Sequence, residues 1–391
     1  MKHHGIYAFL ALFIIISSTH RGIAAIPPAL RIENIVLAPI QPHQDNPHII
    51  WYDDFNEDRL SSYLEPSASS PHARRSAKEN LGGTGHSMEC YYPKGSQGFG
   101  NRKLVFGDSP VGKPVRAGEK FDDIYWRIYV KHQAGWSGSP AKMSRATGLV
   151  TSKWNQAFIS HVWSSGLALT LDPATGVRSN QVVTTQYNDF DRLKWLGNKP
   201  AGRFPVHVTE ESGRWVCIES RIKLNTPGKK DGYAALWVDG KLDTERNNLD
   251  FRGSYTGRGA SVNAIFLEAY WNSGSPIDQY RWYDDFVVST APIGPLTATA
   301  NPTLVRTAGE CKGWEVQIAD GKEIILWSSK LLVGTAARVT VTTQSGNFHG
   351  SISSRSSLPS GTVYFCRIRQ QSLANEWSQW SDWHQPFYAA K

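Results

Sequence analysis

The chain has 391 residues, which is too long for one small domain and predicts two or three domains of ~100–200 residues each. Charged residues make up 19% and hydrophobic residues 40%, and this balance excludes a chain that is disordered throughout. The formal net charge is +8, but the basic residues do not form a Lys/Arg block, so we expect no nucleic-acid partner.

The first 25 residues are typical of a secretory signal peptide. Lys2, His3 and His4 precede the apolar run Ile6–Ile16, which is too short to span a bilayer, and Ala24 or Ala25 is a plausible cleavage point. We therefore expect a secreted protein, extracellular or periplasmic, with no membrane span after cleavage. The alternative is that the segment is retained as an anchor.

Short alternating runs separated by Gly, Pro, Asn and Asp predict an all-β domain over residues 51–290, after an extended lead-in over 26–50. The runs Asp122–Lys131, Trp215–Leu224 and Asn263–Asn272 each have one apolar side. The opposite side mixes aromatic and charged residues, which favours a carbohydrate-binding face. The alternative is a face that another segment of the chain covers.

The pentapeptide Trp-Tyr-Asp-Asp-Phe occurs at 51–55 and again at 282–286. The likeness does not extend far, so these segments are not a domain repeat. We expect them to be the first and last strands of one closed sandwich, lying near each other.

Residues 291–303 have the composition of a linker, and 304–391 have the size of one β-sandwich. The four cysteines show no C-x-x-C spacing, so they predict neither a metal site nor a redox motif. We expect a disulfide between Cys311 and Cys366, whereas Cys90 and Cys217 could pair or remain buried thiols.

Three segments carry a resemblance to a known family: W-x-x-I-E-x-R-I-K-L-N-T-P-G-x-x-D-G-x-x-x-x-W-V-D-G at 215–240, then F-L-E-A-Y-W-N and W-Y-D-D-F-V-V-S-T. Together they resemble the concanavalin A-like jelly rolls of secreted polysaccharide lyases and related carbohydrate-binding domains. Residues 364–381, which include W-S-Q-W-S, resemble the end of a fibronectin type III domain. The implied fold is all-β: a jelly-roll β-sandwich followed by a smaller fibronectin type III-like sandwich. The second resemblance implies that Arg367 and Arg369 stack between Trp377 and Trp380.

The first resemblance implies β-elimination on an acidic, uronic-acid-containing polysaccharide. That reaction needs a group that neutralises the sugar carboxylate, a base that removes the C5 proton and an acid that protonates the leaving oxygen. The matching positions give His161, Tyr270, Arg127 and Tyr187 as catalytic candidates. The substrate-binding candidates are Tyr125, Tyr129, Lys131, Lys142, Arg145, Trp163, Asn188, Glu268 and Asn272.

The resemblance also implies a structural Ca²⁺ where first and last strands meet, held by Asp53, Asp54, Asp284 and Asp285. The alternative is that these are ordinary strand and turn residues. No His/Cys spacing suits zinc, and we expect no organic cofactor. We expect a monomer.

The chain departs from the best-known alginate lyases, because their R-x-E-x-R, Q-I-H and Y-x-K-x-G-x-Y-N-Q elements are not intact. Two other functions therefore remain open. One is a non-catalytic, lectin-like surface protein, in which Arg127 only stacks on tyrosines and His161 is an interior residue. The other is a glycoside hydrolase, although the chain has no E-x-D-x-x-E run that would supply paired carboxylates.

Overall fold

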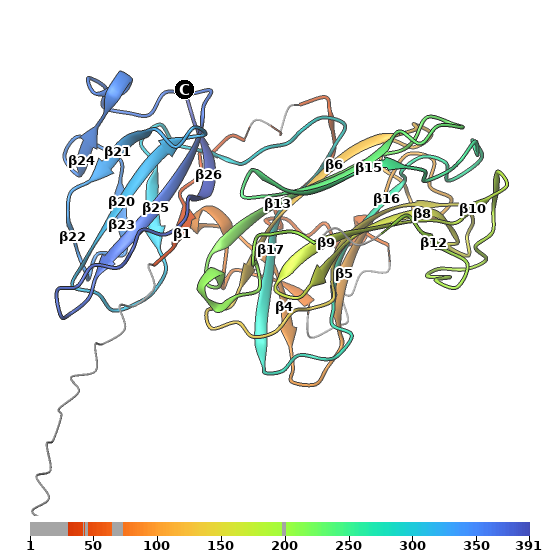
Figure 1. The fold of residues 1–391 in the computed structure, drawn as a ribbon, viewed down its shortest axis with the longest axis horizontal. Helices are drawn as coiled ribbons and strands as arrows, with labels where there is room; N and C mark the ends of the chain where they lie inside the picture. Colours follow the sequence, from red (N-terminus) through yellow and green to blue (C-terminus); the bar gives the residue numbers. More distant parts are fainter. Residues whose placement is uncertain (1–29, 42, 44–45, 65–72, 198–200) are drawn as a thin grey trace, which may run out of the picture.

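The computed structural model describes residues 30–41, 43, 46–64, 73–197 and 201–391, so the predicted signal peptide lies outside the described residues. The fold is all-β, as predicted, and comprises two β-sandwiches (Figure 1). The short 3₁₀ helices are η1 (Leu60–Ser62), η3 (Leu81–Gly83), η4 (Thr209–Glu211) and η5 (Gly350–Ile352). Within the described ranges, no helix is long and apolar enough to cross a bilayer.

The larger sandwich is a jelly roll of two antiparallel sheets. The six-stranded sheet consists, in spatial order, of β12 (Lys194–Trp195), β9 (Ala168–Thr175), β8 (Gln156–Ser165), β7 (Lys142–Leu149), β16 (Ala264–Tyr270) and β5 (Gly98–Val105). The eight-stranded sheet consists of β15 (Lys241–Leu249), β14 (Gly232–Val238), β13 (Trp215–Lys223), β6 (Asp123–His132), β17 (Gln279–Ser289), β4 (Ser87–Tyr92) and β3 (Ala73–Ser76), with β2 (Ile49–Asp53) beside β17. A hairpin of β10 (Val177–Arg178) and β11 (Gln181–Val182) extends from the first sheet.

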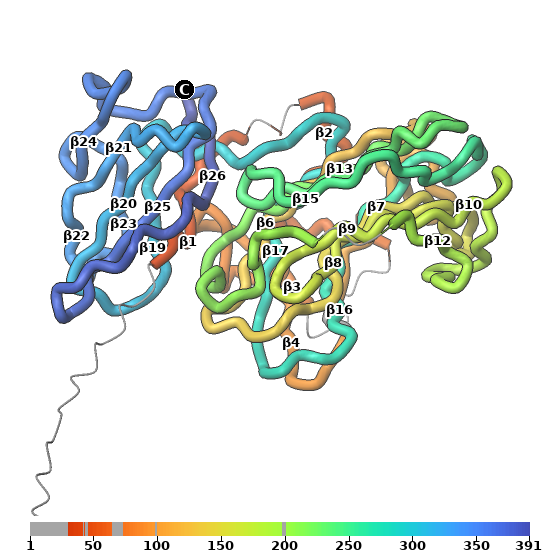
Figure 2. The backbone as a smooth tube through the Cα atoms, viewed as in Figure 1, coloured from red at the N-terminus to blue at the C-terminus, as the bar shows by residue number. Residues whose placement is uncertain are grey.

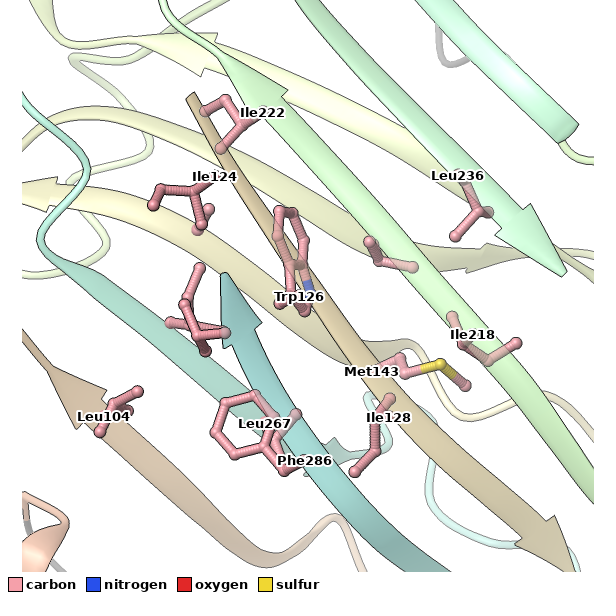
Figure 3. Packing of buried hydrophobic residues seen from close by; sticks show 14 of the residues in the cluster. Leu104, Ile124, Trp126, Ile128, Met143, Ile218, Ile222, Leu236, Leu267 and Phe286 are labelled. Atoms are coloured by element: carbon pink, nitrogen blue, oxygen red, sulfur yellow. The ribbon is translucent and has the colours of Figure 1, made fainter. Parts of the chain in front are cut away.

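Strand alternation places the core between the two sheets. In β6, Ile124, Trp126 and Ile128 point inward, and they pack with Met143 of β7 and Leu267 of β16 (Figure 3). The Trp126 indole donates to the Ser144 hydroxyl at 3.0 Å, which satisfies its only polar atom. Each fully buried side chain of this size contributes roughly 1.5–3 kcal/mol. The inward side predicted for these strands is confirmed.

The repeated pentapeptide marks where the sandwich closes. Asp53 of β2 lies opposite Phe286 of β17, and Trp51 lies opposite Val288 in the same antiparallel ladder. The first and last strands of the jelly roll are therefore neighbours, as predicted.

The smaller sandwich contains one strand from the beginning of the chain. Its three-stranded sheet consists of β1 (Ile32–Ile35), β19 (Thr303–Arg306) and β23 (Arg338–Thr340). Its seven-stranded sheet consists of β18 (Thr297–Ala298), β26 (His384–Ala389), β25 (Val363–Gln371), β20 (Gly313–Asp320), β21 (Ile325–Ser329) and β24 (Gly346–Phe348), with β22 (Leu332–Val333) beside β20. In Figures 1 and 2 the orange β1 lies among the blue strands of this unit.

This pairing changes the role of two segments that looked like connectors. The lead-in over 26–50 contains β1, whose Ile32 and Ile35 are buried in the core of the smaller sandwich. The predicted linker over 291–303 contains β18, which pairs with β26. Both connectors are thus parts of the fold rather than spacers between domains.

The predicted stack is confirmed for Arg369, which lies between Trp377 and Trp380, whereas Arg367 lies between Trp380 and Trp383. The Arg367 guanidinium lies 5.0 Å from the Trp380 ring centroid and 4.5 Å from that of Trp383. The Arg369 guanidinium lies 4.5 Å from Trp377 and 4.7 Å from Trp380. The stack thus includes one more tryptophan than expected. The fibronectin type III likeness of the whole unit stays a prediction.

The predicted Cys311–Cys366 disulfide is wrong, because all four cysteines are free and buried. Cys366 lies opposite Ile318 in the β20–β25 ladder, whereas Cys311 precedes the start of β20 at Gly313. At ~3.3 Å per residue, the five residue steps from Gly313 to Ile318 already span on the order of 16 Å along the strand, and Cys311 lies before Gly313. A disulfide requires Cα atoms within about 7 Å.

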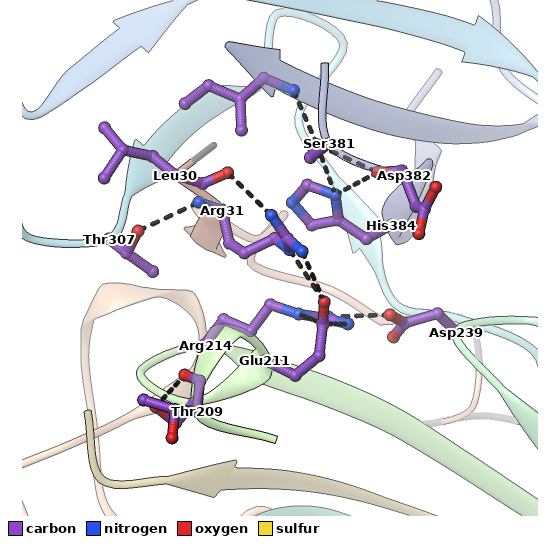
Figure 4. Close-up of polar contacts among 12 residues, drawn as sticks. Leu30, Arg31, Thr209, Glu211, Arg214, Asp239, Thr307, Ser381, Asp382 and His384 are labelled. Atoms are coloured by element: carbon purple, nitrogen blue, oxygen red, sulfur yellow. Dashed lines mark hydrogen bonds and ion pairs between the residues drawn. The ribbon is translucent and has the colours of Figure 1, made fainter. Parts of the chain in front are cut away.

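A buried network of charges joins the two sandwiches (Figure 4). Arg214 is fully buried and forms ion pairs with Glu211 at 2.6 Å and Asp239 at 2.8 Å. Glu211 also accepts from Arg31, just before β1, at 2.9 Å. Because a buried charge is costly unless it is paired, this network holds the N-terminal segment against the jelly roll.

His384 completes the junction in its neutral form. Its Nε2 accepts from the Ile32 N–H at 2.7 Å, while Nδ1 lies 2.8 Å from the Asp382 carbonyl oxygen and donates to it. Burial lowers the pKa of His384 from 6.5 to about 3, and the cation of Arg214 acts in the same direction. Protonation of Nε2 would remove the acceptor for Ile32.

We predict that acid destabilises the fold through this residue. Between pH 7 and pH 5 the unfolded chain binds a proton at His384 that the folded chain does not, so the free energy of unfolding falls by about 2 kcal/mol. Urea unfolding at both pH values measures the loss. In His384→Gln the pH-dependent loss should shrink by that amount, whereas His48→Gln, at an exposed position, should keep all of it. Equal losses in His384→Gln and the wild type would contradict the prediction.

Candidate functional site

The outer face of the six-stranded sheet carries a row of chemically active side chains. Phe266 of β16 lies opposite Arg145 of β7, which lies opposite His161 of β8, which lies opposite Asp172 of β9. Directly opposed residues point to the same side of a sheet. The row therefore crosses four neighbouring strands, and it contains two of the residues predicted from sequence.

Arg145 lies at the centre of this face. Its guanidinium is 1% exposed, forms an ion pair with Glu268 and donates to the Asn188 amide oxygen at 2.6 Å. The Tyr187 ring lies 5.1 Å away. Burial acts to lower the pKa of Arg145, but Glu268 and Tyr187 together outweigh it and raise the pKa above its ordinary value. Arg145 is therefore a permanent cation whose charge is already balanced.

Lys142 and Tyr270 lie where the face opens to solvent. The Lys142 ammonium is 4.8 Å from the Tyr270 ring centroid and 5.8 Å from that of Trp163. Tyr270 is 37% exposed, and its hydroxyl donates to the Gln97 side-chain oxygen at 3.2 Å. Burial lowers the pKa of Lys142, against the opposing attraction of Glu268. The amine is thus easier to deprotonate than that of an ordinary surface lysine.

His161 lies on the predicted face but is fully buried. Its ring is 3.9 Å from the Trp163 ring, centroid to centroid, and 6.0 Å from that of Trp195. Phe190 completes the aromatic cover at 6.4 Å. A residue beneath this cover does not suit direct contact with a polymer, so the interior alternative fits His161 better than the predicted role as base.

Sequence analysis missed three residues of this face. Lys103 of β5 lies 4.8 Å from the Trp154 ring and 5.7 Å from the Tyr187 ring. Gln97 is the partner of Tyr270. Trp195 is 37% exposed, and a tryptophan in the polar stretch R-L-K-W-L-G-N is a signal that could have identified it. Nothing comparable in the sequence indicates Lys103 or Gln97.

Four predicted residues lie on the other sheet, so the structure contradicts their assignment to the site. They are the outward-facing residues of β6: Tyr125, Arg127, Tyr129 and Lys131. Arg127 pairs with Asp285 and donates to the Gly294 carbonyl oxygen, and the Tyr129 hydroxyl accepts from the Leu296 N–H at 3.0 Å. Lys131 pairs with Glu33 at 2.6 Å.

The physical reason is that the chain covers this face itself. Residues 293–296 and the segment around Glu33 lie over β6, and all four predicted residues are buried. Arg127 is thus a structural residue, as in the covered-face alternative. Asn272 follows β16 and borders the open face, where its carbonyl oxygen accepts from Gln97 at 2.9 Å.

The four aspartates proposed for calcium each have partners within the protein. Asp53 accepts from the Tyr63 hydroxyl at 2.6 Å, Asp54 accepts from Asn56, Asp284 accepts from the Leu81 N–H and Asp285 pairs with Arg127. In the described part of the chain, no three His, Cys, Asp or Glu side chains form a group that could hold a metal ion. The calcium ion therefore stays a prediction.

Comparisons with known proteins give structural likeness only. No protein-family profile matches the chain. No curated protein sequence matches it either.

Several of the similar solved structures are polysaccharide lyases of the jelly-roll type. The endo-β-1,4-glucuronan lyase of the fungus Trichoderma reesei aligns with 62% of this chain and 96% of its own, at 15% identity and a TM-score of 0.42. The alginate lyase of the marine Aplysia kurodai aligns with 62% of this chain and 99% of its own, at 15% identity and 0.39. An alginate lyase of a Chlorella virus covers 56% and 90%, at 14% identity and 0.38. At these values the likeness does not assign an activity.

We predict that the Arg145–Glu268 pair is needed for stability. Arg145→Met leaves the Glu268 carboxylate buried without its cation, which should lower the free energy of unfolding by about 3–5 kcal/mol. Adding Glu268→Gln removes the unpaired charge, so the double variant should recover most of that loss. Urea unfolding of the three proteins measures both effects. A double variant as unstable as Arg145→Met would rule out this role for the pair.

Proposed function

We propose that the protein is a secreted polysaccharide lyase that cleaves an acidic, uronic-acid-containing polysaccharide by β-elimination. The observation that carries the proposal is the Lys142–Tyr270 pair: an amine with a lowered pKa lies 4.8 Å from the ring of a solvent-accessible phenol. Both residues belong to a face with exposed aromatic rings, on which pyranose rings pack well.

The two side chains suit the two proton transfers of the reaction. The neutral amine of Lys142 removes the C5 proton of the uronate, and the electron pair forms the C4–C5 double bond as the C4–O4 bond breaks. Tyr270 donates its hydroxyl proton to the leaving O4. No oxidant, reductant or water is consumed, and each product keeps its carboxylate.

The carboxylate of the reacting sugar requires neutralisation by a group other than Arg145, whose charge is balanced by Glu268. The Asn188 amide faces this region because its oxygen accepts from Arg145, which leaves its N–H donors for a ligand. Lys103 supplies a second positive charge on the same face. This division of roles differs from the one implied by resemblance, in which Arg127 and His161 acted.

The second candidate function is non-catalytic carbohydrate binding. Two observations favour carbohydrate binding without cleavage: His161 is buried, and the charge of Arg145 is paired with Glu268. Neither side chain is then available for the lyase reaction. The same aromatic face would then hold the glycan without cleaving it.

Product formation tests the proposal. The wild type should generate ultraviolet-absorbing unsaturated ends from glucuronan or alginate, at a rate that rises with pH as Lys142 loses its proton. Lys142→Arg keeps the charge but cannot act as base at neutral pH, so kcat should fall about 10²-fold or more while glycan retention in affinity electrophoresis persists. Tyr270→Phe removes only the hydroxyl and should reduce kcat similarly.

Lys153→Ala, which removes an exposed lysine beyond β7, serves as the matched control and should retain full activity. Retention of glycan without any ultraviolet signal across a panel of uronate polymers would support the binding protein instead. Full activity in Lys142→Arg would show that the proposed base is wrong.

A further inference from the structure

A cavity is lined by residues of β10 and β12, among others. Figure 2 shows these two strands at the end of the jelly roll that is farthest from the smaller sandwich. The volume of the cavity is about 700 Å³, and it is formed where the outer strands of the two sheets approach each other. Its lining includes Arg178, Lys194 and Lys230, against a single carboxylate, Asp250. The cavity is therefore positively charged.

These cations are available to a ligand. All three are exposed, and among the described residues none of them forms an ion pair. Asp250 is engaged in its own turn, where it accepts from the Gly253 N–H at 2.8 Å. The excess of positive charge thus faces solvent rather than balancing groups of the protein.

One wall of the cavity is held in place by its turn. Ser179 and Asn180 connect β10 to β11 with positive φ values of 47° and 59°, as a tight two-residue hairpin requires. The Asn180 side-chain oxygen accepts from the Ser254 N–H at 3.0 Å, which ties the hairpin to a loop at the edge of the other sheet. The cavity is therefore formed before any ligand binds.

An aromatic track connects this cavity to the candidate active site. Trp195 lines the cavity and lies 5.9 Å from Trp163, ring to ring. Trp163 lies 5.8 Å from the Lys142 ammonium, which lies 4.8 Å from Tyr270. A glycan that leaves Tyr270 along these rings reaches the cationic cavity without leaving the protein surface.

We propose that this cavity is a distal subsite for a carboxylate-bearing sugar of the same polymer, several residues away from the bond that is cleaved. The inference rests on the proposed function, because the ligand is a remote part of the same acidic chain. The exposed Trp195 ring supplies the apolar platform, and Arg178, Lys194 and Lys230 attract the carboxylates. Long substrates engage this subsite and short ones do not.

Calorimetric binding of oligoglucuronates of increasing length tests the subsite, in a Tyr270→Phe background that slows cleavage. Affinity should rise in a second step once the chain is long enough to reach Trp195. The triple substitution Arg178→Ala, Lys194→Ala and Lys230→Ala should weaken binding of the long oligomers about tenfold, or ~1.4 kcal/mol, and leave that of the short ones unchanged. The step should also weaken as salt is raised, because exposed charges are screened.

The matched control is Lys322→Ala with Lys330→Ala and Lys391→Ala, which removes the same charge from exposed positions of the smaller sandwich. This control variant should bind the long oligomers with the same affinity as the Tyr270→Phe background protein. Equal weakening in the control and the cavity variant, or equal weakening of short and long oligomers, would overturn the distal subsite alone. If no uronate oligomer binds the background protein at any length, both this proposal and the proposed function fail.

Discussion

The buried cation of Arg214 is the constraint on which the arrangement of the two sandwiches depends. It is fully removed from water, so Glu211 and Asp239 must lie beside it. Glu211 in turn binds Arg31, which places β1 where it can pair with β19 and where Ile32 can donate to His384. The position of the N-terminal segment then determines which face of the jelly roll remains open.

That choice of face explains the location of the candidate site. The outer face of the eight-stranded sheet has Arg127, Tyr129 and Lys131, and it is closed by residues 293–296 and Glu33. The six-stranded sheet has a similar mixture of rings and charges but retains exposed residues, Tyr270 and Trp195 among them. A polysaccharide can bind only to an accessible surface, and the outer face of the six-stranded sheet provides one.

Local pattern predicted a large part of this fold. The alternation in β6 correctly separated Trp126 from Arg127, and the repeated pentapeptide correctly placed β2 beside β17. Pattern could not show which of two similar outer faces the chain would cover, because covering is decided by contacts between residues far apart in sequence. The same limit applies to Cys311 and Cys366, whose spacing suggested a bridge that strand register forbids. Sequence analysis identified five residues of the candidate site: Lys142, Arg145, Trp163, Glu268 and Tyr270. It could not predict the burial of His161, which follows only from the rings packed over it.

The membership of β1 in the smaller sandwich has a consequence for biosynthesis. The Arg31 N–H donates to the Thr307 hydroxyl across 276 residues of chain, so β1 gains its partner strand β19 only after the whole jelly roll has been synthesised. Until then Ile32 and Ile35 have no core to enter, and an unpaired strand edge can pair with other chains. The smaller sandwich therefore needs a strand that is made before the jelly roll, and it cannot complete its folding until the strands from β18 to β26 have been synthesised.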